Sequence, residues 1–391
     1  MFDKSAIGSV GVTGNFDVPR TCGAEINVKM QGAPCMTRIL KHLWAGALLL
    51  GTALVATAAV AAPPADALAV RKDSGNLLVT WRAAGPVDVL VADKPDAPAG
   101  SARILSPRDL DGQAMIPDTA GKRVYILLRD VRSGDVARVA ERVLPLEAGS
   151  NFRDIGGYAA ANGRHVRWGL IYRSGATPLL TEVDRQRIGT LGLANMVDLR
   201  SDEERVLAPS RIDGVPYTAI GYSMGQLMAG FNAAGGAGEG YRALPALLAP
   251  HLRQIFARLL RHEGPLVYNC SAGQDRTGFV TAVILSALGT PYPTIVEDYH
   301  LSIRYRRPEF EMPHLDPQQL GGSPTAAMFA RFQNDPRARQ PQPLKTADGT
   351  AYLDFAFAEM KARWGGVDGY LRQAIGLGTA DIARLRALYT L

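Results

Sequence analysis

Residues 268–278 read YNCSAGQDRTG, and this stretch decides how the surrounding chain is expected to fold. Cys270 and Arg276 stand six positions apart, with only small or polar residues and one carboxylate between them. The short apolar segment 265–268 predicts a strand before the loop, and the apolar segment 277–288 predicts a helix after it. The pattern is therefore a strand, a tight loop and a helix N-terminus, an arrangement that binds phosphate through backbone N–H groups.

The residues of this loop are suited to phosphoryl transfer. A cysteine attacks phosphorus as the thiolate, and a helix N-terminus favours that anion at Cys270. Arg276 can bind two phosphate oxygens at once and stabilise the charge that develops on them. The loop residues that we expect to surround the phosphate are Ser271, Ala272, Gly273, Gln274 and Gly278. The opposing interpretation is that a lone buried cysteine serves only as a small apolar residue.

Two further roles are needed to complete a phosphatase. The Thr277 hydroxyl can reach back to the sulfur and stabilise it as a leaving group when the intermediate is hydrolysed. A carboxyl group must protonate the departing oxygen. Asp275 is the nearest in sequence, and Asp198 and Asp202 follow a predicted strand. Asp275 has an alternative role, which is to hold Arg276 or to cap the helix. Together these residues predict hydrolysis of phosphate esters through a cysteinyl-phosphate.

From residue 151 onward, strand-like segments alternate with segments of helical spacing. The strand-like runs are 170–173, 196–199 and 265–268. The helical runs are 181–191, 247–262 and 277–288. This alternation predicts an α/β fold with a mainly parallel sheet flanked by helices. Two stretches, 224–240 and 307–350, are predicted to be irregular and are either lids over a site or surface insertions.

The segment before residue 148 has a different pattern. Residues 68–147 contain about seven short β-prone runs divided by turn signals, which predicts a small all-β sandwich. Trp81 and Tyr125 resemble the core of a fibronectin type III or immunoglobulin-like module. No constellation of catalytic residue types stands out, so we expect an accessory that positions the substrate or binds a partner. The expected domains are residues 67–147 and 148–391.

Residues 1–62 predict a leader. The uncharged segment 43–62 follows basic residues and ends in Val-Ala-Ala, as a signal peptide does. Because Met36 stands just before this pattern, we expect 1–35 to be an upstream extension from a misassigned start and 36–62 to be the signal peptide. The alternative is an uncleaved membrane anchor, since about 20 apolar residues can just span a bilayer. Cleavage predicts a periplasmic or secreted protein without a stable membrane anchor.

Cysteine and histidine usage limits the chemistry. Cys22 and Cys35 precede Met36, so Cys270 is the only thiol expected in the mature chain, and no internal disulfide is expected. The six histidines show no ligand-like pairing, so no metal or other cofactor is expected. The net charge of +6 is modest, and the sequence shows no basic stripe interleaved with aromatic residues. Both observations argue against nucleic-acid binding.

Beside the loop, four ordered motifs carry a resemblance to a known family. They are NFRDIGG at 151–157, YRSG at 172–175, VDLRS at 197–201 and DYHLS at 298–302. Over about residues 148–391 the chain resembles the protein tyrosine phosphatases, specifically the bacterial tyrosine/serine type with dual protein and lipid activity. The resemblance implies a tyrosine-phosphatase-type α/β fold, with Cys270 as nucleophile, Arg276 as phosphate ligand and Asp275 as acid.

The motifs outside the loop add expected substrate-binding residues, and two positions depart from the family pattern. Arg153, Asp154 and Asp198 are the added residues. Asn269 stands where the family usually has His, which leaves the activation of the thiolate open. Gln274 stands where Lys is frequent, which weakens the case for a polyphosphorylated lipid.

Three functions remain open from the sequence. The first is hydrolysis of phosphotyrosine, extending to phosphoserine and phosphothreonine, in a protein or peptide. The second is hydrolysis of a phosphoinositide by the same chemistry. The third is a catalytically weak phosphate-binding module, which Asn269 motivates. Sulfur transfer and arsenate reduction are weaker options, because such enzymes often need a second thiol.

Overall fold

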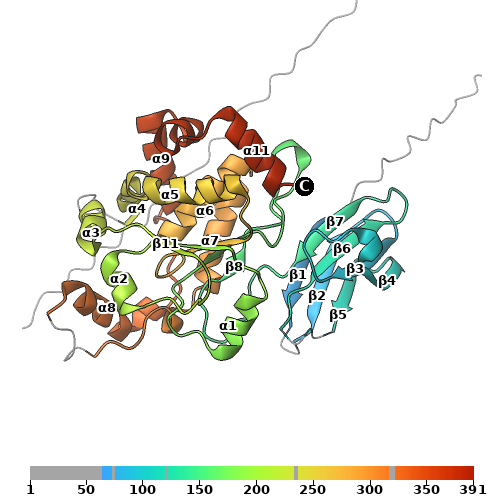
Figure 1. Ribbon diagram of the computed structural model, residues 1–391, viewed down its shortest axis with the longest axis horizontal. Helices are drawn as coiled ribbons and strands as arrows, with labels where there is room; N and C mark the ends of the chain where they lie inside the picture. Colours follow the sequence, from blue (N-terminus) through green and yellow to red (C-terminus); the bar gives the residue numbers. More distant parts are fainter. Residues whose placement is uncertain (1–63, 73–74, 118, 120, 233–236, 317–321) are drawn as a thin grey trace, which may run out of the picture. The chain divides into compact units, whose positions relative to one another are not determined.

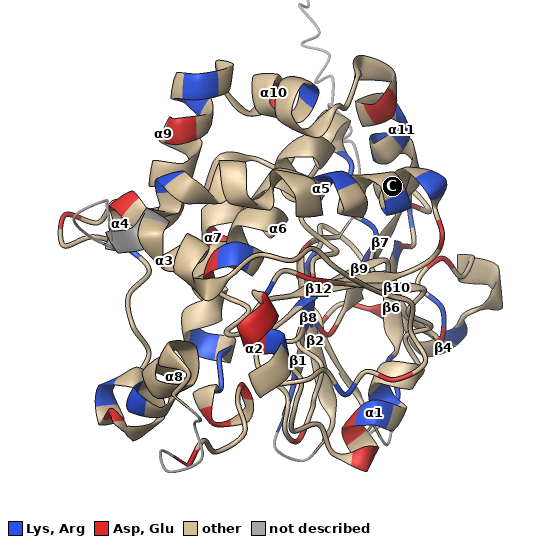
Figure 2. Cartoon of the chain, turned by 60° about the vertical axis from the view of Figure 1, so that its left-hand side comes forward, with Lys and Arg blue, Asp and Glu red and all other residues tan. Residues whose placement is uncertain are grey.

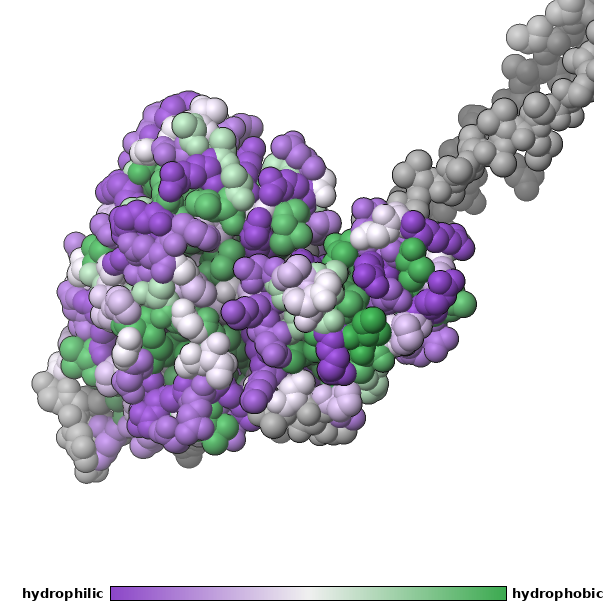
Figure 3. All heavy atoms as spheres, turned by 45° about the vertical axis from the view of Figure 1, so that its right-hand side comes forward, coloured by the Kyte–Doolittle hydropathy of each residue, from purple (hydrophilic) through white to green (hydrophobic). Residues whose placement is uncertain are grey.

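Figure 1 shows the computed structural model, which describes residues 64–391 apart from 73–74, 118, 120, 233–236 and 317–321. These residues all belong to one compact unit. The predicted leader, with Cys22 and Cys35, lies outside the described residues. Among the helices that are described, none combines the length and hydropathy needed to cross a bilayer. Hydrophilic and apolar residues are intermixed on the face shown in Figure 3.

A five-stranded sheet carries the catalytic loop. Its strand order is β11-β10-β12-β9-β8, with β8 Arg153–Asp154, β9 Ile171–Ser174, β10 Asn195–Asp198, β11 Tyr217–Ala219 and β12 Leu266–Asn269. The pairs β10–β11, β10–β12 and β12–β9 are parallel, and only β8 runs antiparallel to its neighbour. The expectation of a mainly parallel α/β sheet is confirmed.

Both faces of this sheet are buried, so its strands are apolar rather than alternating with polar residues. Val267 points to a cluster that includes Phe152 and Ile188, whereas its neighbours Leu266 and Tyr268 point to the larger core on the other face. The cluster around Ile188 is closed by α1 Glu182–Gly189. The helices that supply the larger core are α5 Leu244–Arg261, α6 Asp275–Leu288, α7 Tyr292–Tyr305, α9 Tyr352–Trp364 and α11 Thr379–Tyr389 (Figure 1).

Local sequence explains where the helices near the site begin and end. In α2 Asp202–Leu207, Ser201 accepts a hydrogen bond from the N–H of Glu204, and the Glu204 carboxylate accepts one from the N–H of Ser201. The helix opens with three acidic residues, shown in red in Figure 2, which favour a helix N-terminus. Helix α6 ends at Gly289, whose φ of +86° suits the left-handed C-cap.

The two stretches predicted to be irregular contain helices, so that prediction is wrong in part. Residues 224–240 include α3 Met224–Asn232 and α4 Ala237–Gly240, and residues 307–350 include α8 Pro324–Asn334. Met224 and Leu227 of α3 share an apolar cluster with Phe329 of α8. The two short helices are stabilised by packing on each other, which composition does not reveal. The chain continues through α10 Val367–Tyr370 and a π-helical turn, Leu371–Ile375, before α11.

Residues 65–140 form seven strands in two antiparallel sheets. The bounds are β1 Ala65–Arg71, β2 Leu77–Arg82, β3 Val87–Ala92, β4 Arg103–Asp109, β5 Gln113–Ile116, β6 Tyr125–Asp130 and β7 Val136–Ala140. One sheet has the order β1-β2-β5 and the other β4-β3-β6-β7. Side chains from both sheets, among them Trp81 and Ile126, enter one buried cluster with Trp168. The Trp168 indole N–H donates to the carbonyl of Arg138.

Candidate active site

The loop between β12 and α6 places the cysteine and the arginine together. Cys270 directly follows β12, and Arg276 lies in the first turn of α6, so both belong to one tight strand-to-helix connection. Cys270 and Arg276 are both buried. Gln274 occupies the N-cap of α6 without capping it through its side chain, so the first N–H groups of the helix can serve an anion.

Gly273 is required by the geometry of the loop. Its φ is +63°, and a Cβ there would lie 2.5 Å from the backbone nitrogen of Gly175, just after β9, and 2.6 Å from the carbonyl of Ser174. The backbones of the loop and of β9 therefore touch at this point. Gly278 has a similar role one turn later, because a Cβ there would lie 2.8 Å from the ring of Tyr299. Both positions therefore leave no room for a side chain.

Glu204 holds Arg276 in place. Arg276 donates from Nη1 and Nη2 to the two oxygens of Glu204, at 2.6 and 2.7 Å, and from Nη1 to the Tyr222 hydroxyl at 2.8 Å. Ser271 Oγ donates to the same carboxylate at 2.6 Å. Burial by itself would raise the pKa of Glu204, but the charge and hydrogen bonds of Arg276 outweigh it and lower the pKa to about 2. The pair is an ionised clamp on the loop.

Sequence reasoning missed Glu204, although a signal was present. Ser201 and Glu204 have the spacing of a capping box, which by itself predicts only the start of a helix. In the structure the same carboxylate that caps α2 also grips Arg276. The second role depends on a contact between residues 72 apart in the sequence, so no local pattern reports it.

The three candidate acids lie in different environments. Asp198 is fully buried, pairs with the Arg200 guanidinium and accepts a hydrogen bond from Tyr217. The Asp202 side chain is 58% exposed and pairs with Arg205. Asp275 alone of the three belongs to the loop, directly before Arg276, and it is partly buried.

Asp275 is held by two hydrogen bonds that end on the same oxygen. The Tyr241 hydroxyl donates to Oδ1, and Gln274 Nε2 donates to Oδ1 at 3.2 Å. The Tyr241 hydroxyl also lies 2.7 Å from the hydroxyl of Tyr299. Tyr241 and Tyr299 were not predicted, and nothing in the sequence near either residue indicates the contact.

A second buried network supports the underside of the loop. Asn151 Nδ2 and Arg173 Nη2 both donate to the Gly273 carbonyl, at 2.7 and 2.8 Å. Arg173 pairs in turn with Asp298 at 2.5 Å, and Asp298 also pairs with Arg153 at 3.2 Å. Burial would raise the pKa of Asp298, but its two arginine partners hold it well below the usual value for aspartate.

Three residues expected to contact substrate lie instead behind the site. Arg153 and Asp154 are consecutive on β8, so their side chains leave on opposite faces of the sheet. Arg153 joins Asp298, whereas Asp154 accepts from the N–H groups of Gly156 and Gly169. With Asp198 they are fully buried and saturated by protein partners. Their expected contact with substrate is corrected to a supporting position.

The remaining predicted residues lie on the loop itself. Thr277 is fully buried, and its hydroxyl has no hydrogen-bond partner among the described residues, Cys270 included. Asn269 Nδ2 donates to the Cys270 carbonyl at 3.3 Å, and its Oδ1 likewise has no described partner. Within the described part of the chain, no cluster of three or more His, Cys, Asp or Glu side chains could hold a metal.

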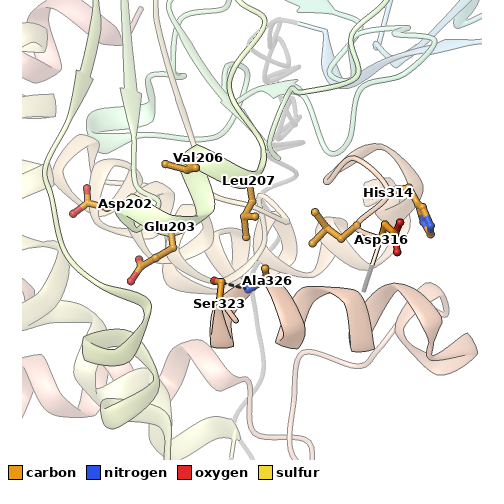
Figure 4. A pocket seen from close by; sticks show the side chains of 9 residues that line it. Asp202, Glu203, Val206, Leu207, His314, Asp316, Ser323 and Ala326 are labelled. Atoms are coloured by element: carbon orange, nitrogen blue, oxygen red, sulfur yellow. Dashed lines mark hydrogen bonds between the residues drawn. The ribbon is translucent and has the colours of Figure 1, made fainter. Parts of the chain in front are cut away.

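A pocket of about 500 Å³ opens between α2 and the start of α8 (Figure 4). Its lining includes Asp202, Glu203, Leu207 and Ala326, but none of the loop residues. It therefore neighbours the helix that carries Glu204 without containing the reactive groups.

Comparison with known proteins agrees with this geometry. Residues 144–391 match the profile of the tyrosine phosphatase family. The chain is 33% identical over 255 residues to a Cupriavidus necator protein named as a tyrosine-protein phosphatase, covering 61% of this chain and 85% of that one. It is 27% identical to a tyrosine-protein phosphatase of Nostoc commune (53% and 69% covered) and 26% identical to the triple specificity protein phosphatase PtpB of Mycobacterium tuberculosis (61% and 95% covered). The chain therefore belongs to the tyrosine phosphatase family and is a phosphatase, a hydrolase of phosphoric monoesters.

Proposed function

We propose that this phosphatase hydrolyses phosphotyrosine, and to a lesser extent phosphoserine and phosphothreonine, through a cysteinyl-phosphate on Cys270. The observation that carries the proposal is the convergence of Cys270, the uncapped N-terminus of α6 and Arg276 on one tight loop. That loop combines a nucleophile, a cradle of N–H groups and a fixed cation, which are the parts that transfer of a phosphoryl group needs.

Arg276 retains donors for the phosphate while it is clamped. A guanidinium has five N–H donors, and the bonds to Glu204 and Tyr222 use three of them. One donor on Nη2 and the donor on Nε are left for two phosphate oxygens. Because Glu204 fixes the guanidinium plane beforehand, binding phosphate costs Arg276 little additional ordering.

The reaction is proposed in two steps. Cys270 Sγ attacks phosphorus, the S–P bond forms, and the P–O bond to the leaving group breaks while Asp275 gives its proton to the departing oxygen. A water molecule then attacks phosphorus, its proton passes to the Asp275 carboxylate, and the S–P bond breaks to regenerate the thiolate. The Thr277 hydroxyl, buried in the first turn of α6, is proposed to donate to the sulfur at this second departure.

Arg153, Asp154 and Asp198 are assigned to support. Asp298 bridges Arg153 and Arg173, and Arg173 supports the loop by donating to the Gly273 carbonyl. None of the three needs to contact the substrate for the two steps above.

The substrate is proposed to be a phosphorylated protein or peptide. The name of the Mycobacterium relative, a triple specificity protein phosphatase, supports a range wider than phosphotyrosine. Gln274 brings no charge to the loop, so a phosphoinositide is the second candidate. Turnover of a phosphotyrosyl peptide against inositol lipids separates the two: faster turnover of the lipid would reverse this order.

The proposal predicts the outcome of a simple set of variants. Cys270→Ser should abolish turnover of p-nitrophenyl phosphate, and Asp275→Asn should reduce it, with circular dichroism confirming that both fold. If wild type showed no vanadate-sensitive turnover but bound a phosphotyrosyl peptide, the chain would be a phosphate-binding module, the alternative that Asn269 motivates. Full activity of Cys270→Ser would refute the cysteinyl-phosphate.

We also propose that residues 36–62 are a signal peptide and that the phosphatase acts in the periplasm or outside the cell. The seven strands of residues 65–140, with Trp81 in the shared core, support a fibronectin type III or immunoglobulin-like accessory domain. Sequencing the N-terminus of the exported chain tests the first point, and a start near residue 63 is expected.

A further inference from the structure

We propose that Tyr241 is a positioning residue for the acid: its hydroxyl fixes the Asp275 carboxyl through Oδ1, so that Oδ2 carries the proton that reaches the leaving group. This inference rests on the proposed role of Asp275 and extends it to a residue far away in the sequence. Tyr241 lies in the 3₁₀ turn Tyr241–Ala243 just before α5, 34 positions from Asp275.

Three elements meet at the Tyr241 hydroxyl. Tyr241 itself precedes α5, Asp275 is the first residue of α6, and Tyr299 lies on α7. The Tyr241 hydroxyl donates to Asp275 Oδ1 and lies 2.7 Å from the Tyr299 hydroxyl. Hydrogen bonds in such a chain polarise one another, which strengthens the bond that ends on the carboxyl group.

The ring of Tyr241 is fixed by packing, so its hydroxyl has one position. Tyr241 is 1% exposed. Its ring meets the ring of Tyr299 edge-on, with centroids 6.3 Å apart and planes at 81°. It also packs against the ring of Tyr352 of α9, with centroids 5.7 Å apart. A hydroxyl held in this way orders its partner without itself needing to be ordered on substrate binding.

The pattern of donors selects the oxygen that holds the acid proton. Both Tyr241 and Gln274 donate to Oδ1, and an oxygen that already accepts two hydrogen bonds is the poorer site for a proton. A proton on the carboxyl group therefore sits on Oδ2. When Asp275 has given up this proton, the same two donors stabilise the carboxylate that must accept a proton from water in the second step.

Tyr241 keeps its own proton throughout. Burial, and then the charge of Asp275, raise the pKa of Tyr241 well above its usual value, and burial likewise raises the pKa of Tyr299. Tyr241 is accordingly a donor at every working pH. It orients Asp275 and transfers no proton itself.

The test varies the leaving group. For aryl phosphates, an acid matters most when the leaving phenol is weakly acidic and least when it is strongly acidic. In Tyr241→Phe, which keeps the packed ring, kcat/KM for phenyl phosphate should fall by about 10- to 100-fold, which is less than the roughly 100- to 10,000-fold that a positioned acid supplies in full. For 2,4-dinitrophenyl phosphate the loss should stay within about 3-fold.

Matched variants separate positioning from packing. Tyr370→Phe removes another buried hydroxyl, one that donates to the Pro245 carbonyl, and its losses should be equal for the two substrates. In an Asp275→Asn background, Tyr241→Phe should cause no further leaving-group-dependent loss, because the two residues act as a unit. If Tyr241→Phe fails to fold, Tyr299→Phe is measured with the same two substrates. Its loss of kcat/KM should be smaller but again greater for phenyl phosphate than for 2,4-dinitrophenyl phosphate.

The outcomes distinguish this inference from the function on which it rests. If Asp275→Asn shows the leaving-group dependence and Tyr241→Phe does not, the positioning role is overturned while the acid stands. If Asp275→Asn shows no dependence, the acid assignment falls and the positioning role falls with it. An equal loss for both substrates in Tyr241→Phe would show that the tyrosine only packs.

Discussion

Replacing Glu204 by Gln should weaken both the fold and the catalytic loop. The Glu204 carboxylate accepts two hydrogen bonds from Arg276, one from Ser271 and one from the N–H of Ser201, and it is fully buried. Gln keeps the shape but loses the charge, and its amide group points donors at the guanidinium. Arg276 would then be a buried cation without its counter-charge, which is far more costly than losing a surface pair.

The size of the effect follows from the pKa of Glu204. Folding lowers that pKa from 4.5 to about 2, and each pKa unit corresponds to about 1.4 kcal/mol, so the charged form stabilises the folded state by about 3 kcal/mol at pH 7. Breaking a buried ion pair by removing one partner costs about 3–5 kcal/mol, which is consistent. Because the folded pKa is the lower one, this stabilisation is complete above pH 4.5 and disappears as the pH falls toward 2.

Urea unfolding of wild type and Glu204→Gln at pH 7 and at pH 3 measures this directly. The difference in the free energy of unfolding should be about 3 kcal/mol at pH 7 and less than about half of that at pH 3. Asp202→Asn, on the same helix but largely exposed, is the control and should change stability by no more than about 0.5 kcal/mol. Equal stability of wild type and Glu204→Gln at pH 7, or a difference that does not shrink at pH 3, would refute the clamp.

Three further predictions concern the loop and its supports. Gly273 has a φ of +63° and no room for a Cβ beside Gly175, so Gly273→Ala should distort the loop and weaken inhibition by vanadate by about 100-fold. Unchanged inhibition would contradict the tight loop. Asp298→Asn should lower the free energy of unfolding by about 3–5 kcal/mol, because Arg153 and Arg173 stay buried; a loss below about 1 kcal/mol in urea unfolding would argue against the network. Asp198→Asn should destabilise the fold but keep the wild-type ratio of activities on phenyl and dinitrophenyl phosphates, and a selective loss on phenyl phosphate would move the acid role to Asp198.

The sequence was most informative where the signal is local. The predicted strand 265–268 and helix 277–288 correspond to β12 Leu266–Asn269 and α6 Asp275–Leu288. Apolar runs, a glycine at a forced turn and a helix that follows are all properties of neighbouring residues, so they can be read before the chain is folded. The ordered motifs are also local, and the family membership expected from them is confirmed.

The partners of the loop could not be predicted, because they arrive from distant parts of the chain. Glu204 is 72 positions from Arg276, and Asp298 is 125 positions from Arg173. Tyr241 follows a stretch that was predicted to be irregular because it is rich in Gly and Ala. A single sequence gives no indication that such residues meet. The site was therefore predicted as a nucleophile, a cation, an acid and a hydroxyl on one loop, without the groups that hold them.

The measurement that tests the account most directly is to trap the phosphorylated enzyme. Asp275→Asn is mixed rapidly with 2,4-dinitrophenyl phosphate, whose leaving group needs little acid, and is quenched and digested for mass spectrometry. The account predicts one phosphoryl group on the peptide that carries Cys270, formed before product phosphate is released and lost as the reaction is chased. Turnover without a phosphoryl group on Cys270, or with one on another residue, would contradict it.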